Sequence, residues 1–61
     1  MKCLVMSVQE VRVGDYMYTV LADSFRLVST IHEYADSIGI MFPNTDAYTI
    51  LKKETIVTIV R

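Results

Sequence analysis

Apolar residues along this chain form a series of short runs that are separated by turn-forming residues. Valine, isoleucine, threonine and tyrosine are prominent in the runs, and such β-branched and aromatic residues favour pleated strands over helices. Short runs with turn signals about every eight to twelve positions are typical of a small all-β barrel or sandwich. The pattern predicts strands at 2–8, 16–21, 25–34, 38–42, 47–51 and 55–60.

The stretch 11–20 is the one around which the other predicted strands are arranged. Gly14 adopts a positive φ at little cost, and Asp15 can hydrogen-bond to the backbone two residues further on, so the pair predicts a turn into the strand 16–21. Both faces of that strand are apolar. We therefore expect one face, beginning at Tyr16 or at Met17, to lie in the core and the other to contact a second subunit or a target.

The segment 25–34 predicts the longest strand. A helix is the competing interpretation, but the segment is rich in β-branched residues and no capping box precedes it. The expected core face carries Phe25, Leu27 and Ile31. Ala35-Asp36-Ser37 provides the turn that ends this strand.

The first and last runs are apolar at nearly every position. The run 2–8 therefore predicts a strand that is covered by the core on one face and by a neighbouring subunit on the other. The run 55–60 is β-branched and uncharged, so it must be paired in the fold. In 38–42, Gly39 indicates a bend, a bulge or the close approach of another backbone. Pro-Asn-Thr-Asp at 43–46 predicts a turn.

The order of these features resembles that of SH3-like small β-barrels. The resemblance rests on a Gly14-Asp15 turn that opens a strand, a long bent strand pair, a turn, a further strand, a one-turn break at 51–54 and a terminal strand. It implies a single domain over 1–61, with five to six short antiparallel strands and a 3₁₀ turn near Leu51-Glu54. The acidic and aromatic groove residues of true SH3 domains are not identifiable, so polyproline binding is not expected.

The length of the chain limits how stable it can be alone. A domain of 61 residues buries a modest core, and small folds usually need a disulfide, a metal or a partner chain. Cys3 and His32 are the only cysteine and histidine, which excludes an intrachain disulfide and a four-ligand zinc site within one chain. Hydrophobic residues make up 52% of the chain. Self-association is therefore expected, so we predict a homo-oligomer.

Charge and segment lengths restrict the partners and the location. The net charge of −1 disfavours binding to duplex nucleic acid. The longest uncharged stretch, 37–45, is too short to span a bilayer, and the first residues lack the pattern of a signal peptide. A lone thiol fits a reducing compartment. We expect a soluble cytoplasmic protein without membrane contact.

Catalysis has little support in the sequence. His32 as a base or metal ligand, and Cys3 as a nucleophile, are each outweighed by ordinary strand roles, because nothing in the sequence activates either residue. The aspartates fall at turns, and two glycines make no phosphate loop. We therefore expect no enzyme activity, no cofactor and no metal.

Tyrosines and nearby cations are the candidate binding residues. Tyrosine combines a large apolar area with a polar tip, which suits subunit contacts and also the stacking of bases beside cations. The candidate residues are Tyr16, Tyr18, Arg26, Tyr34, Tyr48, Lys52 and Lys53.

Two functions remain open on the sequence. The first is a non-enzymatic binding or inhibitory module that acts as a homo-oligomer on a protein partner, in the manner of the accessory proteins of phages and mobile elements. The alternative is a module that binds nucleotides or single-stranded nucleic acid, with a small anionic ligand held at a subunit interface.

Overall fold

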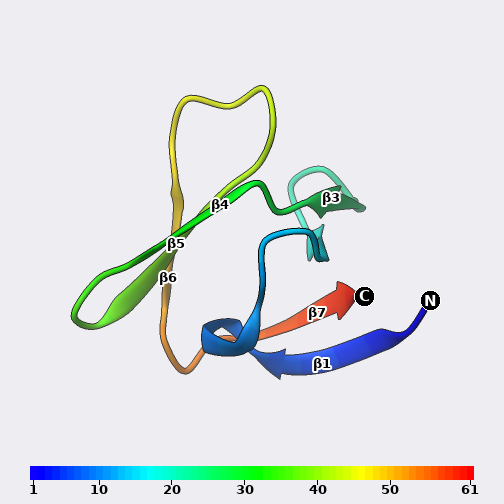
Figure 1. The fold of residues 1–61 in the computed structure, drawn as a ribbon, viewed down its shortest axis with the longest axis horizontal. Coiled ribbons are helices and arrows are strands. Elements are labelled where there is room, and N and C mark those ends of the chain that lie inside the picture. The colour runs from blue at the N-terminus through cyan, green and yellow to red at the C-terminus, as the bar shows by residue number, and fades with distance from the viewer.

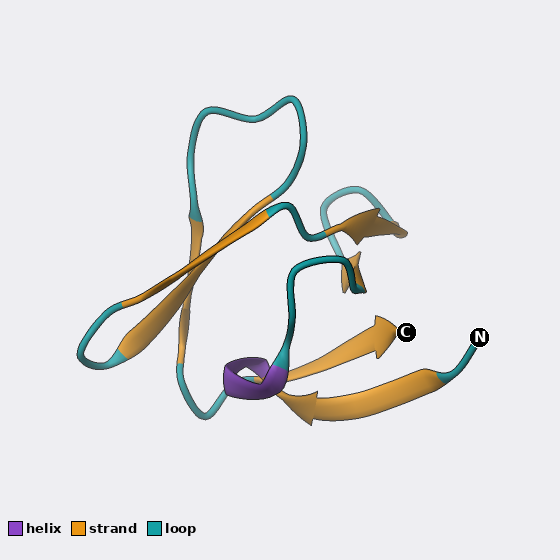
Figure 2. Cartoon of the chain, viewed as in Figure 1, coloured by secondary structure: helices purple, strands orange, loops and turns teal.

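The chain folds into seven antiparallel strands and one short 3₁₀ helix, as seen in a computed structural model that describes residues 1–61 (Figures 1 and 2). The predicted all-β class is confirmed, but the structure has seven strands rather than the predicted five to six, because the segment 25–34 forms two of them. The 3₁₀ helix η1 spans Val8–Glu10. The strands are β1 (Cys3–Ser7), β2 (Tyr16–Thr19), β3 (Ser24–Leu27), β4 (Thr30–Glu33), β5 (Ser37–Met41), β6 (Thr49–Lys52) and β7 (Ile56–Val60).

The strands form two separate sheets. Sheet A has the order β1-β7-β2-β3, and sheet B has the order β4-β5-β6. Figure 1 shows β1 and β7 side by side, with the two termini at the same end of the pair. The terminal strand β7 is paired on both sides, as the sequence predicted. No strand belongs to both sheets, so they do not close into a barrel, and the SH3-like closure stays a prediction.

The predicted single strand 25–34 is wrong, because the chain changes sheets at Val28 and Ser29. The amide of Val28 donates to the Asp15 carbonyl at 2.8 Å, and the amide of Ser29 donates to the Met41 carbonyl at 2.9 Å. These bonds place the Val28 side chain in the core and shift the alternation by one residue. The predicted core face is therefore split: Ile31 packs against the core, whereas Phe25 is exposed.

The predicted 3₁₀ turn near Leu51-Glu54 is also wrong. A tight turn joins β6 to β7 there, and the amide of Thr55 donates to the Lys52 carbonyl at 3.0 Å. The 3₁₀ helix instead follows β1, where the Ser7 hydroxyl accepts a hydrogen bond from the amide of Gln9 as an N-cap. This early helix ends β1 one residue before the predicted end.

The core lies between the two sheets. Met17 is 3% exposed, so the face of β2 that contains Met17 points inward and the face with Tyr16 points outward. Ile38, Ile40 and Phe42, which alternate along the segment 38–42, are all buried in this core. The buried apolar side chains are Val8, Val11, Met17, Val28, Ile38, Ile40, Phe42 and Ile59.

A partly buried ion pair between Asp15 and Arg61 holds the turn that leads into β2. Gly14 has the expected positive φ, at 100°. The Asp15 carboxylate, which is 6% exposed, accepts hydrogen bonds from Arg61 Nε at 3.0 Å, from Arg61 Nη2 at 2.9 Å and from the Arg12 amide at 2.9 Å. The backbone partner of Asp15 thus lies three residues before it, not two after it. The Arg61 guanidinium, followed by the Arg12 amide, lowers the pKa of Asp15.

Candidate functional site

The outer face of sheet A is an uncharged surface. Strand register aligns its side chains in rows across the sheet: Cys3 lies opposite Val60, Val60 opposite Tyr16, and Tyr16 opposite Leu27. We use the name outer face of sheet A for the ten strand residues that alternate away from the core. These are Cys3, Val5, Ser7, Tyr16, Tyr18, Phe25, Leu27, Ile56, Thr58 and Val60.

Large apolar side chains on this face are open to solvent. Val5 is 70% exposed and Ile56 is 64% exposed, and the rings of Tyr18 and Phe25 meet edge to face at 5.5 Å. The Tyr18 hydroxyl donates to Asp23 Oδ1 at 2.6 Å, which raises the pKa of Tyr18. The sequence predicted that the core covers one face of the first strand and a neighbouring subunit the other; within the single chain Val5 is open, and the cover by a subunit stays a prediction. The outer face of sheet A is therefore an exposed apolar patch in the single chain.

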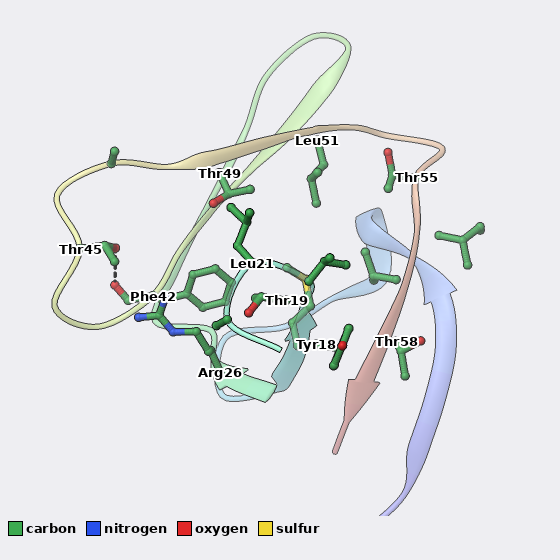
Figure 3. Close-up of a pocket in the computed structure, with 16 residues that line it drawn as sticks. Tyr18, Thr19, Leu21, Arg26, Phe42, Thr45, Thr49, Leu51, Thr55 and Thr58 are labelled. Carbon is green, nitrogen blue, oxygen red and sulfur yellow. Dashed lines mark hydrogen bonds between the residues drawn. The ribbon is translucent and has the colours of Figure 1, made fainter. Parts of the chain in front are cut away.

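An apolar cleft opens between the sheets where a barrel would close. Its volume is about 440 Å³, and β2, β6, β7 and the loops beside them line it (Figure 3). The pairing between β2 and β7 stops after Met17 and Ile59, so β7 pairs only with β1 from Ile56 to Thr58. β6 pairs only with β5. The cleft therefore lies beside the unpaired edges of β6 and β7.

Arg26 is the one charged residue among the sixteen that line the cleft. Its guanidinium carbon lies 5.0 Å from the centre of the Phe42 ring, and Nη2 donates to the Pro43 carbonyl at 3.4 Å. Figure 3 shows Arg26 and Phe42 together at one end of the cleft, with Thr55 and Thr58 at the other. Arg26 takes part in neither of the two ion pairs of the chain, so its charge is available to a ligand.

A third surface lies on the outer face of sheet B. The ring centre of His32 is 4.4 Å from that of Tyr34 and 6.0 Å from that of Tyr48. The two tyrosine rings cover Gly39, where an added Cβ would lie 3.1 Å from each ring. The predicted close approach at Gly39 is present, but aromatic side chains make it rather than another backbone.

Gly39→Ala tests how firmly these rings are held. The backbone of Gly39 is not in the left-handed region, so alanine is compatible with it. The new methyl group displaces the rings by a few tenths of an ångström, and the lower entropy of the unfolded chain offsets that cost. We expect a net change within about 1 kcal/mol in chemical denaturation. A larger loss would show that the rings are fixed, and Gly39→Val is expected to be clearly worse.

The predicted binding residues do not all form one site. Tyr16 and Tyr18 lie on the outer face of sheet A, and Tyr34 and Tyr48 lie on the outer face of sheet B. Arg26 lies in the cleft, which Tyr18 also lines. The remaining two cations, Lys52 and Lys53, flank the turn after β6. Lys53 Nζ contacts Glu33 Oε2 at 2.8 Å and lowers the pKa of Glu33, whereas Lys52 is exposed.

Sequence reasoning missed several residues of these surfaces. It did not select Val5, Phe25 or Ile56 for binding, although the uncharged runs 2–8 and 55–60 were a usable signal. The threonines that line the cleft could not be selected from the sequence. They lie in different segments, and they share one cleft only because β2 and β7 separate in the fold. Those threonines are Thr19, Thr45, Thr49, Thr55 and Thr58.

Residues weighed for catalysis are far apart in the fold. Cys3 is an exposed residue of β1 in sheet A, and His32 lies in β4 on the outer face of sheet B. The structure therefore does not pair the thiol with the imidazole. No three side chains of the histidine, cysteine, aspartate and glutamate types lie close enough together to hold a metal ion.

The structure has no helix with the length and apolar character needed to cross a membrane. Searches for similarity matched this chain to no family model, no curated protein and no solved structure.

Proposed function

We propose that this protein is a non-enzymatic binding module that works as a homo-oligomer through the outer face of sheet A. One observation carries the proposal: all ten outer-face strand positions are uncharged, and the largest exposed side chains among them are apolar or aromatic. A small domain gains stability by burying such a face against a copy of itself. A face that meets its own copy forms a two-fold interface.

The dimensions of the face set the strength of the expected contact. Four strands about 4.8 Å apart, each about 17 Å long, present on the order of 300 Å² in projection. Stable interfaces bury about 800 Å² of accessible surface per partner, so this face lies at the small end of the range. We therefore expect a dimer of two sheets packed about 10 Å apart, with an affinity that makes dilution visible.

Val5→Glu tests this interface. A carboxylate at the open position opposite Thr58 would lose its water in the dimer without gaining a partner, so we expect the dimer to dissociate at least tenfold more readily. Size-exclusion chromatography with light scattering over a range of protein concentrations measures this change. Ile50→Glu is the matched control, because Ile50 is 53% exposed on sheet B and should leave the mass unchanged.

A wild-type protein that stays monomeric at millimolar concentration contradicts the proposal, as does an unchanged dimer in Val5→Glu. Thermal melting of both variants shows whether the monomer is folded. Val5 is open to solvent in the single chain, so a change in association with intact melting identifies the interface.

The partner and location in this proposal follow from the same surfaces. A second protein would contact the tyrosines that the dimer leaves open, in the manner of small accessory proteins that bind a host protein. The exposed thiol of Cys3 suits a reducing compartment, which supports a cytoplasmic location.

The second candidate, binding of single-stranded nucleic acid, is favoured by the aromatic group on sheet B. His32, Tyr34 and Tyr48 lie together, and Lys52 shares their face of the sheet. Stacked rings beside a cation suit unpaired bases. Fluorescence anisotropy with oligo(dT) at low and high salt tests it. Salt-sensitive binding that Tyr48→Ala removes would support this function, and no binding at low salt would reject it.

A further inference from the structure

The cleft combines an apolar interior with a single positive charge. Ten of its sixteen lining residues are hydrophobic, five are threonines and one is Arg26. Its volume of about 440 Å³ falls within the range of ligand pockets, roughly 300–1,000 Å³. The lining therefore suits a ligand that is mostly apolar and carries one negative charge.

Arg26 is held ready for such a charge. Its guanidinium packs over Phe42, and its one hydrogen bond, to the Pro43 carbonyl, is long at 3.4 Å. A guanidinium has five N–H donors, so most of them are free. Its planar fork forms two parallel hydrogen bonds at once with a carboxylate or a phosphate. A carboxylate carries the single negative charge that one guanidinium can balance, whereas a phosphate monoester carries about 1.5 to 2 negative charges at pH 7.

The remainder of the cleft suits a chain of methylene groups. Leu51, Ile56 and Val57 present apolar groups along it, and Thr49 and Thr55 add methyl groups. Figure 3 shows Thr49, Leu51 and Thr55 following one another from the Phe42 end of the cleft toward β7. No second cation lines the cleft, so a nucleotide polyphosphate would have most of its charge unpaired there.

Leu21 stands beside the opening without cover. It is fully exposed in the β2–β3 turn, and it is also one of the residues that line the cleft. A leucine in such a position gains by packing on an apolar ligand, because exposed apolar area is removed from water on both sides. A bound alkyl chain would therefore be covered by Leu21.

We propose that the cleft binds an amphipathic monocarboxylate with an unbranched alkyl tail, of the medium-chain fatty-acid class. The carboxylate pairs with Arg26, and the tail lies along Leu51 and Val57 under Leu21. Three residues, Tyr18, Ile56 and Thr58, both line the cleft and belong to the outer face of sheet A, but Val5 does not line the cleft, so a substitution there tests self-association without altering the lining.

The test compares decanoate with decan-1-ol and decylamine, each kept below the concentration at which it forms micelles. We expect isothermal titration calorimetry to show the tightest binding for decanoate, and NMR spectra to show shifts at Leu21, Leu51 and Val57. Arg26→Met should weaken decanoate binding about tenfold or more, because a charge-assisted pair is lost, and should leave decan-1-ol binding unchanged. Arg26→Lys should recover part of the loss.

Lys52→Met is the control for net charge and should bind decanoate as the wild type does. Equal affinity for decanoate and decylamine would overturn the proposal, and so would an Arg26→Met variant that melts normally and binds decanoate unchanged. Absence of any decanoate binding would overturn it as well. Val5→Glu should still bind decanoate, so this result and the result on association are read independently.

Discussion

Replacing Ile40 with alanine is expected to remove a large part of the stability of the protein. Ile40 is 0% exposed at the centre of β5, between Ile31 on β4 and Thr49 on β6. Removing a buried isoleucine to alanine costs about 2–5 kcal/mol, because apolar contacts are lost and a cavity remains. A domain of this size has only about 5 kcal/mol of stability, so a loss at the upper end of that range would leave about half of the molecules unfolded.

Ile50→Ala is the matched control for this prediction. It is the same change in the adjacent strand, but Ile50 is 53% exposed on the opposite face of sheet B. We expect its midpoint of urea unfolding, followed by circular dichroism, to move by much less than that of Ile40→Ala. Similar losses at the two positions would mean that the core does not lie between the sheets as described. Ile40→Val should fall between the wild type and Ile40→Ala, at about 1 kcal/mol.

Asp15→Ala is expected to have the next largest effect. The substitution removes the acceptor of three hydrogen bonds. The Arg12 amide then has no partner, and Arg61 keeps only weaker contacts from Nη2 to the Glu10 carbonyl at 3.3 Å and to Met6 Sδ at 3.9 Å. We expect a loss of about 2–3 kcal/mol, held below the value for a fully buried pair because Arg61 reaches solvent. In a domain of this size that loss lowers the melting temperature by roughly 10–20 °C.

The same ion pair sets how stability depends on acid. Arg61 holds the pKa of folded Asp15 below its usual value of 3.8, at which the unfolded chain takes up the proton. The stabilisation by Asp15 is therefore complete above pH 3.8 and is lost as the pH falls below it toward the folded pKa. Urea unfolding measured between pH 2 and pH 6 should show a decline below about pH 4 in the wild type and a flatter profile in Asp15→Asn.

Asp36→Asn is the control for both measurements on Asp15. Asp36 is exposed in the turn between β4 and β5, and its carboxylate makes no ion pair. We expect the midpoint and the acid profile of this variant to match those of the wild type. If Asp36→Asn flattened the acid profile as much as Asp15→Asn, the ion pair between Asp15 and Arg61 would not be the source of the acid sensitivity. Glu33 pairs with Lys53 at the surface, where solvent keeps the contribution small.

Most strands could be predicted from local composition, but their grouping into sheets could not. The predicted strands 38–42 and 55–60 match β5 and β7 to within one residue at each end, because their apolar and β-branched residues favour the strand conformation locally. The segment 25–34 contains no glycine, proline, asparagine or aspartate to mark a turn, yet it bends at Val28 to enter the core. That bend depends on bonds to Asp15 and Met41, which are far from it in sequence.

The sequence predicted the chemical character of the candidate surfaces, but it did not predict where they lie in the fold. The apolar character of both faces of β2 showed that one face would lie open, and the open face is the one with Tyr16. The tyrosines and cations selected from the sequence are divided between two sheet faces and a cleft, because strand alternation separates neighbours in sequence. Arg26 was selected for a stacking surface with Tyr34, and it instead packs on Phe42 inside the cleft.

The sequence alone determined the all-β class, the principal turns and the excess of apolar surface, since each follows from local conformational preference or from composition. The tertiary structure alone decided which face of β2 is buried, where the long segment breaks, and that β2 separates from β7 to leave a cleft with one charge. These features depend on pairing between residues distant in the chain, such as Asp15 with Arg61, and local composition carries no record of such pairing.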